Sequence, residues 1–333
     1  MRVLVTGAGG FIGRVLVQRL LAHGLGGRPV DAVVACDLSL QGLPADPRLH
    51  RVAGSIADAG VLEQALAQPV RAVQSVQTVF HLASVPGGAA EQDPVLGRRV
   101  NLDATLRLVD LLRDRAPAAG PAPQLVFAST VAVYGDPLPA VVDDDTPARP
   151  AMSYGAHKLA AEILLADASR RGWIDACSLR LPGVVARPGD GAGLVSAFMS
   201  QLFWKLRDGV PIVLPVSADG SAWWISVGAC VDNLLHAATL PRHAAGATCT
   251  LQMPALQLTM QQVVDALARR HGQRCRALVR YEPREAVQRL FASFPPLHTP
   301  RADALGLRHD GSADGLVARA LAGGAHDPRA TKV

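Results

Sequence analysis

Residues 3–13 read VLVTGAGGFIG, a short run of β-forming side chains that passes directly into a glycine-rich turn. After the turn, Val15, Leu16, Leu20 and Leu21 recur at the spacing of one helical face. The stretch therefore predicts a strand, a tight turn and a helix.

The glycines of this turn have the spacing G-x-x-G-x-x-G. A backbone without side chains can approach a pyrophosphate closely, and the N-terminus of the following helix offers free amides and the positive end of its dipole. The motif is weak alone, but its place between a strand and a helix favours a dinucleotide site over an ordinary tight turn. We expect cofactor contacts from Gly7, Gly10, Phe11, Ile12 and Gly13.

A second predicted strand, residues 30–36, ends at Asp37, about 24 residues beyond the last glycine of the turn. An acid at this position accepts hydrogen bonds from the ribose and repels the additional phosphate of NADP, so Asp37 favours NAD. A solvated turn aspartate is the alternative. A third short strand near residues 49–52 leads to Ser55 and Ile56, whose loop we expect to reach the adenine.

Further β-rich runs alternate with helical patterns, as in a doubly wound parallel sheet. The expected strands cover residues 76–82, 124–128 and 175–181, and the expected helices about 91–113 and 153–171. Later helical patterns cover 193–207, 230–240, 259–271, 284–291 and 312–321. We predict an α/β fold with three parts: a Rossmann-type NAD-binding domain over 1–185, a smaller C-terminal α+β substrate lobe over 186–322 that returns some segments to the first domain, and a flexible tail over 323–333.

Small and polar residues follow one predicted strand at the carboxyl edge of the sheet, where ligands of open α/β folds bind. These are Leu82, Ala83 and Ser84, and we interpret His81 before them as a packed histidine rather than a catalyst. Asn101 lies in the middle of the long helix predicted next. Its amide indicates a kink or a site for a proton-relay water, with a solvent-facing side chain as the alternative.

Tyr154 and Lys158 are four residues apart in a segment that predicts helix, so their side chains lie on one face. A tyrosine is a poor base at neutral pH, and a lysine held beside it favours the phenolate and makes proton transfer feasible. The chain contains only three lysines, so an incidental surface pair is a poor alternative. The hydroxyls of Ser129 and Thr130, at the end of another strand, can donate to a substrate oxygen.

The bulk composition argues against several other classes of protein. The 333 residues are 49% hydrophobic and 4% aromatic, with a net charge of +5 from scattered arginines, so we expect a globular core and no nucleic-acid partner. No apolar run approaches the ~20 residues that span a bilayer, which predicts no membrane partner and a cytoplasmic location. Asp143, Asp144 and Asp145 are consecutive, so their side chains diverge and indicate a solvated loop rather than a metal site.

The cysteines are odd in number, far apart and without a Cys-x-x-Cys pair. They are Cys36, Cys177, Cys230, Cys249 and Cys275. The pattern signals neither a disulfide framework nor a zinc site, and we interpret the cysteines as buried free thiols.

The order and spacing of these motifs resemble the extended short-chain dehydrogenase/reductase family over nearly the whole chain. The motifs concerned are TGAGGFIG, Asp37, residues 81–83, residues 129–135 and the Tyr154/Lys158 pair. The resemblance implies a seven-stranded Rossmann sheet, an NAD(P) cofactor and a Ser/Thr-Tyr-Lys catalytic group. The catalytic residues that it implies are Tyr154, Lys158, Thr130, Ser129 and Asn101. The further cofactor contacts expected are Leu82, Ala83, Ser84, Asn101, Ser129, Tyr154, Lys158, Pro182 and Val184.

Within the family, segments 26–31, 88–103 and 179–185 resemble the D-erythronate dehydrogenase subfamily. The resemblance implies NAD-dependent oxidation of a small sugar acid, such as D-erythronate, at C2 to the 2-keto acid by a homodimer. Substrate contacts are expected from Ser84, Thr130, Tyr154, Arg187 and Trp224, with Arg187 as the cation for the carboxylate.

Two alternatives remain open. A nucleotide-sugar epimerase or dehydratase would share all these motifs, but such enzymes usually carry a substrate-binding Asn after the sixth strand and an Arg for the phosphates farther on. This chain has Pro182–Ala186 and Ala222–Ala229 at those places. A non-catalytic NAD-binding sensor is the other alternative, and it usually lacks the Tyr/Lys pair.

Overall fold

The computed structural model describes residues 1–67, 75–116, 120–189, 195–241 and 249–323. Its centre is a seven-stranded sheet in the order β10-β6-β5-β4-β1-β2-β3, in which every neighbouring pair is parallel. The strands are β1 (Arg2–Thr6), β2 (Ala32–Asp37), β3 (Leu49–Ala53), β4 (Thr78–His81), β5 (Gln124–Thr130), β6 (Asp175–Leu181) and β10 (Cys249–Gln252). The strand order reverses between β1 and β4, and this switch point is where a doubly wound sheet binds its ligand.

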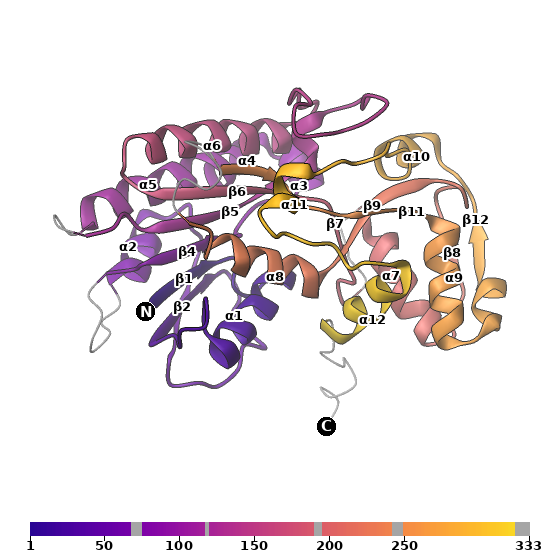
Figure 1. Ribbon diagram of the computed structural model, residues 1–333, viewed down its shortest axis with the longest axis horizontal. Coiled ribbons are helices and arrows are strands. Elements are labelled where there is room, and N and C mark those ends of the chain that lie inside the picture. Colours follow the sequence, from indigo (N-terminus) through magenta and orange to yellow (C-terminus); the bar gives the residue numbers. More distant parts are fainter. Residues whose placement is uncertain (68–74, 117–119, 190–194, 242–248, 324–333) are drawn as a thin grey trace.

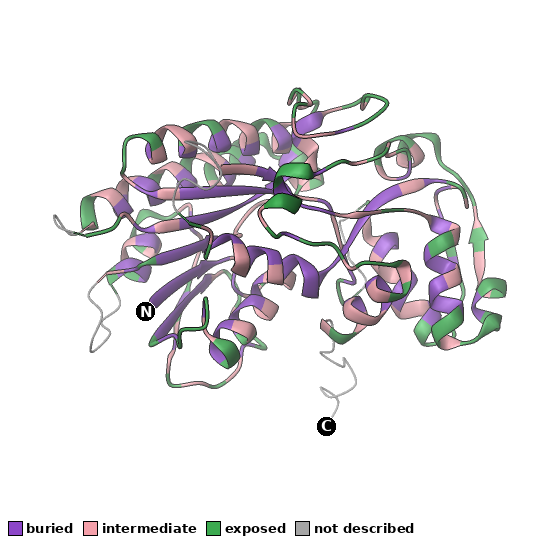
Figure 2. Ribbon diagram, viewed as in Figure 1, coloured by how far each residue is buried: buried purple, intermediate pink, exposed green. Residues whose placement is uncertain are grey.

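Helices cover both faces of this sheet (Figure 1). One face carries α1 (Phe11–His23) and α8 (Val227–Ala237), and the other carries α2 (Ala59–Ala67), α5 (Ala104–Arg115) and α6 (Ser153–Arg170). The strands of the sheet are buried along most of their length, whereas the helices expose their outer sides (Figure 2). The near-continuous apolar runs of the strands follow from this burial on both faces. The predicted seven-stranded Rossmann-type sheet is confirmed.

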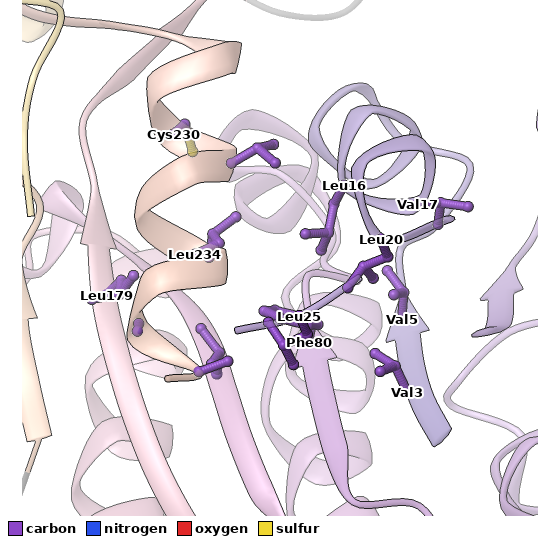
Figure 3. Packing of buried hydrophobic residues seen from close by; sticks show 14 of the residues in the cluster. Val3, Val5, Leu16, Val17, Leu20, Leu25, Phe80, Leu179, Cys230 and Leu234 are labelled. Atoms are coloured by element: carbon purple, nitrogen blue, oxygen red, sulfur yellow. The ribbon is translucent and has the colours of Figure 1, made fainter. Parts of the chain in front are cut away.

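Apolar side chains from distant parts of the chain meet between α1 and α8. Leu16 and Leu20 of α1 pack with Leu234 of α8 over Val5 of β1 (Figure 3). Helix α8 and strand β10 follow the first strands and helices of the second lobe in sequence, yet they complete the Rossmann unit. The chain therefore passes back into its first domain after residue 226.

The helix predicted over residues 91–113 is present from Pro94 onward, but it begins later than expected and contains a π-helical turn. The structure has α3 (Gly87–Gln92), α4 (Pro94–Arg98), a π-helical turn (Arg99–Asp103) and α5 over this stretch. Asp93 ends α3, and its side chain accepts a hydrogen bond from the Leu96 amide at 2.9 Å as the cap of α4, with Pro94 in the first position of that helix. An Asp-Pro pair starts a helix more readily than it continues one.

The second lobe contains a three-stranded sheet, a two-stranded sheet and several helices around a separate core. Its strands are β7 (Gly183–Val185), β8 (Ile212–Leu214), β9 (Ser221–Ser226), β11 (Leu256–Thr259) and β12 (Val279–Tyr281). Its helices are α7 (Ala197–Arg207), α9 (Met260–His271), α10 (Glu285–Phe291), the short α11 (Pro300–Ala304) and α12 (Ala313–Gly323).

The late helices occur where their patterns predict them, with ends that differ by a few residues. Capping side chains set some of these ends: Thr259 and Gln262 form a capping box at α9, and the Ser226 hydroxyl accepts from the Ala229 amide at α8. Gly323 ends α12 instead of opening a tail, while the rest of the predicted tail and the start of the pattern at 193–207 lie outside the described residues.

The expectation of free thiols is wrong for two of the five cysteines. Cys177 and Cys249 form a disulfide, because β6 and β10 are parallel neighbours whose register places these residues opposite each other, with Cα atoms 4.6 Å apart. Cys36, Cys230 and Cys275 are free and buried, as predicted. In the described part of the chain, no helix is long and apolar enough to cross a bilayer.

Candidate active site and cofactor site

The glycine turn after β1 has no room for side chains. A Cβ atom on Gly9 would lie 1.7 Å from the Ser39 carbonyl oxygen, and one on Gly13 would lie 2.1 Å from the carbonyl oxygen of Gly7. Gly7 itself adopts φ +71°, in the left-handed region that favours glycine. No side chain caps α1, so the first amides of this helix are available to a ligand. The turn fits the pyrophosphate of a dinucleotide.

Asp37 ends β2 beside this turn. Its Oδ2 accepts a hydrogen bond from the Gly9 amide at 2.9 Å, so the carboxylate is held at the place predicted for the adenosine ribose. This fixed negative charge is the observation behind the expected preference for NAD.

We expect NADP to bind at least about tenfold more weakly than NAD, because its 2′-phosphate would lie beside the Asp37 carboxylate. Fluorescence titration with the two reduced cofactors measures this ratio. Asp37→Asn keeps an acceptor for the Gly9 amide and removes the charge, so it should narrow the difference, whereas Asp31→Asn at the opposite end of β2 should not. Equal or tighter NADP binding by the wild type would contradict the assignment.

The remaining predicted cofactor residues lie on both sides of the switch point. Leu82 and Ala83 follow β4, and their amides donate to the main chain and the side chain of Thr6 at 3.1 and 3.3 Å. Ser55 accepts from the Ala57 amide at 3.2 Å. The Ile56 side chain is buried in the core, so only the backbone of this residue can contact an adenine.

The other residues expected to contact the cofactor follow β6 or lie in the first turn of α1. Pro182 is buried, and Val184, in β7, packs partly buried against the main core. Phe11 and Ile12 pack against the same core from the first turn of α1. Most of the predicted cofactor residues therefore lie in or next to the glycine turn and the segments that follow β2, β4, β5 and β6.

Tyr154 lies in the first turn of α6, with its phenol between two hydroxyls. The hydroxyls of Ser84 and Thr130 and the Arg187 guanidinium are near enough to this phenol to affect its pKa. Burial raises the pKa of Tyr154, whereas the two hydroxyls and then Arg187 act to lower it. Three of the residues predicted for the substrate thus converge on the predicted base.

Lys158 is almost completely buried one turn later on α6. Its Nζ donates to the Ala128 carbonyl oxygen at 2.8 Å and lies 4.5 Å from the ring centroid of Phe127. Burial lowers the pKa of Lys158 to about 7, while Glu162 acts to raise it. The ammonium hydrogen-bonds to the end of β5 and lies 5.9 Å from the ring centroid of Tyr154, and its effect on the pKa of Tyr154 stays a prediction.

The hydroxyl predicted at Ser129 does not face the phenol. Ser129 Oγ donates to Glu162, which also accepts from Arg180 Nη2 at 2.8 Å and from Arg180 Nε at 3.1 Å. The Arg180 guanidinium lies 5.1 Å from the ring centroid of Tyr134. We therefore assign the orienting hydroxyl to Thr130 and withdraw Ser129 as a catalytic residue. Sequence reasoning missed Glu162 and Arg180, although a Glu four residues after Lys158 was a visible signal.

Asn101 is buried in the π-helical turn, so the kink predicted at this residue is present. Its Oδ1 accepts from the Val85 amide at 2.8 Å and its Nδ2 donates to the Val85 carbonyl oxygen at 3.0 Å. The amide therefore holds the loop that carries Ser84, and the solvent-facing alternative is excluded. His81 is packed as predicted, with Nδ1 and Nε2 bonded to Thr6 and Thr105 at 2.7 and 2.9 Å.

Trp224 was expected at the substrate, and this is wrong. Its ring is fully buried in the core of the second lobe against Phe203, and its Nε1 donates to the Leu258 carbonyl oxygen at 3.0 Å. Trp223 is also buried and donates to Pro295 at 2.7 Å. Successive side chains of β9 point to opposite faces, and both faces of this strand are covered.

The metal alternative gains no support from the acidic loop. Asp143 Oδ1 accepts from the Asp145 amide and the Thr146 hydroxyl at 3.1 and 2.8 Å, and Asp144 accepts from the Arg301 amide at 2.9 Å. Among the described residues, no group of three His, Cys, Asp or Glu side chains could hold a metal ion.

Comparison with known proteins places this geometry in a family. The chain matches the NAD dependent epimerase/dehydratase family over residues 3–248. It belongs to that family. The chain is 37% identical to a D-erythronate dehydrogenase of Cupriavidus necator over 95% of its own length and 97% of that protein. It is 29% identical to a D-erythronate dehydrogenase of Haemophilus influenzae, over 95% and 98% of the two chains.

A solved structure is also similar over most of the chain. It is described as the nucleoside-diphosphate-sugar epimerase from Agrobacterium tumefaciens, with a TM-score of 0.86 and 34% identity over 95% of this chain and 92% of that one. These findings confirm the predicted family, the Rossmann-type fold, the NAD cofactor and an NAD-dependent enzyme.

Proposed function

We propose that the protein oxidises the C2 hydroxyl of a small sugar acid, such as D-erythronate, to the 2-keto acid with NAD. The observation that carries this proposal is the position of Arg187, a cation beside Phe11 at the glycine turn whose charge acts on the Tyr154 phenol. A carboxylate beside a reacting hydroxyl needs such a cation. The similarity to D-erythronate dehydrogenases in two organisms supports the same substrate class.

The second lobe holds Arg187 by its backbone. Its amide donates to Ser200 Oγ at 3.0 Å, and its carbonyl oxygen accepts from Trp204 Nε1 at 2.8 Å. Ser200 and Trp204 are one turn apart on α7, so both contacts come from one face of a helix. The guanidinium lies 5.3 Å from the ring centroid of Phe11, at the start of α1. Arg187 therefore spans from the second lobe to the glycine turn.

The chemistry of the site follows from these positions. Bound NAD supplies the acceptor for the hydride that leaves the carbinol carbon. The hydroxyl proton goes to Tyr154 Oη, which acts as the base in its phenolate form. The hydroxyls of Thr130 and Ser84 lie near the phenol and can hold the substrate oxygen beside it. Arg187 binds the neighbouring carboxylate and favours the phenolate by its charge.

A nucleotide-sugar epimerase is the second candidate, because the similar Agrobacterium structure is described as one. In the stretch 222–229 this chain has no Lys or Arg for a diphosphate, and residues 222–225 of β9 are buried. A charge-assisted contact worth about 1.5–3 kcal/mol would be missing there. A non-catalytic sensor is disfavoured, since Tyr154 and Lys158 are both present and Tyr154 is in contact with two hydroxyls.

A substrate panel distinguishes these functions. We expect reduced NAD to accumulate with four- or five-carbon aldonates, including D-erythronate, and not with plain sugars, UDP-sugars or GDP-sugars. Absorbance of the reduced nicotinamide reports the reaction, and chromatography of the nucleotide sugars reports epimerisation without net reduction. Activity confined to the nucleotide sugars would overturn the proposal.

We also propose a homodimer formed through α4 and α6, which pack on each other. Large apolar side chains are exposed on both helices: Val95, Leu96, Ile163 and Leu164. A second copy of the chain would remove them from water. We expect a dimer by light scattering after size exclusion, and a monomer for Ile163→Glu. Leu290→Glu, an exposed site on α10, is the control and should remain dimeric; a monomeric wild type would contradict the proposal.

The cytoplasm is the proposed compartment, because the reaction draws on a free pool of NAD. Fractionation of cells that express the tagged chain tests this location. Recovery of the protein in a membrane or secreted fraction would contradict it.

A further inference from the structure

A buried acid, Glu162, lies on the same helix as the proposed catalytic pair, Tyr154 and Lys158. Glu162 lies on α6, one turn after Lys158, and its side chain is 3% exposed. Its carboxylate accepts from Ser129 on β5 and from both Nε and Nη2 of Arg180 on β6. One charged group thus joins α6 to two neighbouring strands, at the end of the sheet where the site lies.

The same contacts reach the partners of the catalytic residues. Ser129 lies between Ala128, whose carbonyl oxygen accepts from Lys158, and Thr130, whose hydroxyl acts to lower the pKa of Tyr154. Fixing Ser129 therefore fixes the strand end from which Lys158 and Tyr154 take their partners.

We propose that Glu162 is a positioning residue of the catalytic pair: anchored by Arg180, its carboxylate holds the end of β5 in place and supplies the negative charge that faces Lys158. The inference concerns the family's reaction and does not depend on the identity of the substrate.

The other titratable groups around Lys158 do not supply this charge. His81 on β4 faces Lys158, but burial lowers its pKa to about 3, so it is neutral at physiological pH. Tyr154 is neutral because burial raises its pKa. Three charged residues on segments packed against α6 act on His157 instead: Glu91 of α3, Arg98 of α4 and Asp103 of the π turn. Arg180 on β6 is paired with Glu162.

The charge has a predictable effect on Lys158. Glu162 acts to raise the pKa of Lys158, which burial lowers to about 7. Without Glu162 the ammonium would lose its proton at a lower pH. The positive charge of Arg180, left without Glu162, would also lower the pKa of Lys158. Without Arg180, an unpaired Glu162 would hold the proton on Lys158 to a higher pH.

The titration of Lys158 can be followed without any substrate, because the chain has only three lysines, Lys158, Lys205 and Lys332. We would label the lysine ε-carbons with ¹³C and assign the signals by NMR with Lys205→Arg and Lys332→Arg. Glu162→Gln should lower the Lys158 midpoint by about one pH unit or more, and Arg180→Gln should raise it. Asp167→Asn, at an exposed acid on the same helix, should leave it unchanged.

Opposite shifts of the Lys158 midpoint in Glu162→Gln and Arg180→Gln indicate an effect of the Glu162 charge. A purely structural defect would shift the midpoint in the same direction in both variants. An unmoved midpoint, or shifts of the same sign, would overturn the proposal. If Glu162→Gln does not fold, Glu162→Asp takes its place in the titration. We then expect a smaller downward shift of the Lys158 midpoint, and an unmoved midpoint would overturn the proposal. If D-erythronate is not oxidised by the wild type, the proposed function fails while this titration still decides the role of Glu162.

Discussion

Replacing Tyr154 by Phe is expected to lower kcat by about 10²- to 10⁴-fold while NAD still binds. The phenol is the group proposed to take the substrate proton, and the hydroxyls of Thr130 and Ser84 and the charge of Arg187 act to lower its pKa. The Phe variant keeps the ring and the glycine turn, so cofactor contacts other than that of the hydroxyl remain. Turnover is measured by absorbance of reduced nicotinamide with D-erythronate, and binding by fluorescence titration with NADH.

Tyr281→Phe is the matched control for this variant. Tyr281 lies in the second lobe, where its hydroxyl donates to Gln261 Oε1 at 3.0 Å, away from the catalytic residues. The Tyr281→Phe variant should lose one hydrogen bond, which costs about 0.5–1.5 kcal/mol of stability, and should keep the wild-type turnover. Comparable activity in wild type and Tyr154→Phe would rule out Tyr154 as the base.

The second large effect is expected at Arg187. Arg187→Met retains an extended apolar side chain beside Phe11 and removes the charge proposed to bind the substrate carboxylate. Loss of a charge-assisted hydrogen bond of about 1.5–3 kcal/mol predicts a fall in kcat/KM of about 10- to 150-fold for an aldonate. Steady-state kinetics over a range of aldonate concentrations measure this fall.

A neutral analogue separates two contributions of Arg187. The guanidinium also favours the phenolate of Tyr154, and the loss of that effect in Arg187→Met reduces oxidation of a neutral polyol such as erythritol and of the acid alike. The additional loss with the acid measures the carboxylate contact. Arg280→Met, at an exposed arginine of the second lobe, should leave both rates unchanged. An equal loss for the acid and the polyol would remove Arg187 as the carboxylate site.

Much of the site could be predicted from the sequence because its parts are local. The strand, glycine turn and helix of residues 3–23 follow from side-chain type and spacing within one short segment. Tyr154 and Lys158 share a face because they are one turn apart on a single helix. The ends of the parallel strands bring Asp37, Ser84 and Thr130 to one edge, which the alternating pattern already implied.

The errors concern contacts between segments that are far apart in the chain. The π turn within the helix predicted over 91–113 carries the buried Asn101 amide, which binds the backbone of Val85 in the loop after β4. Cys177 and Cys249 pair because of the register of β10 beside β6, which nothing within either segment specifies. Trp224 is in the core because both faces of β9 are covered, a fact of packing and not of pattern.

The sequence by itself determined the Rossmann-type sheet, the dinucleotide turn and the identity of the acid/base pair, because each depends on periodicity or on residues within a few positions of one another. Only the tertiary structure decided that Ser129 turns to Glu162 while Thr130 meets the phenol. It also decided that α7 holds Arg187 at the site and that Glu162 is paired with Arg180 behind Lys158. These choices depend on which buried polar groups can satisfy one another once the helices and strands have packed, and a buried charge without a partner is too costly to remain.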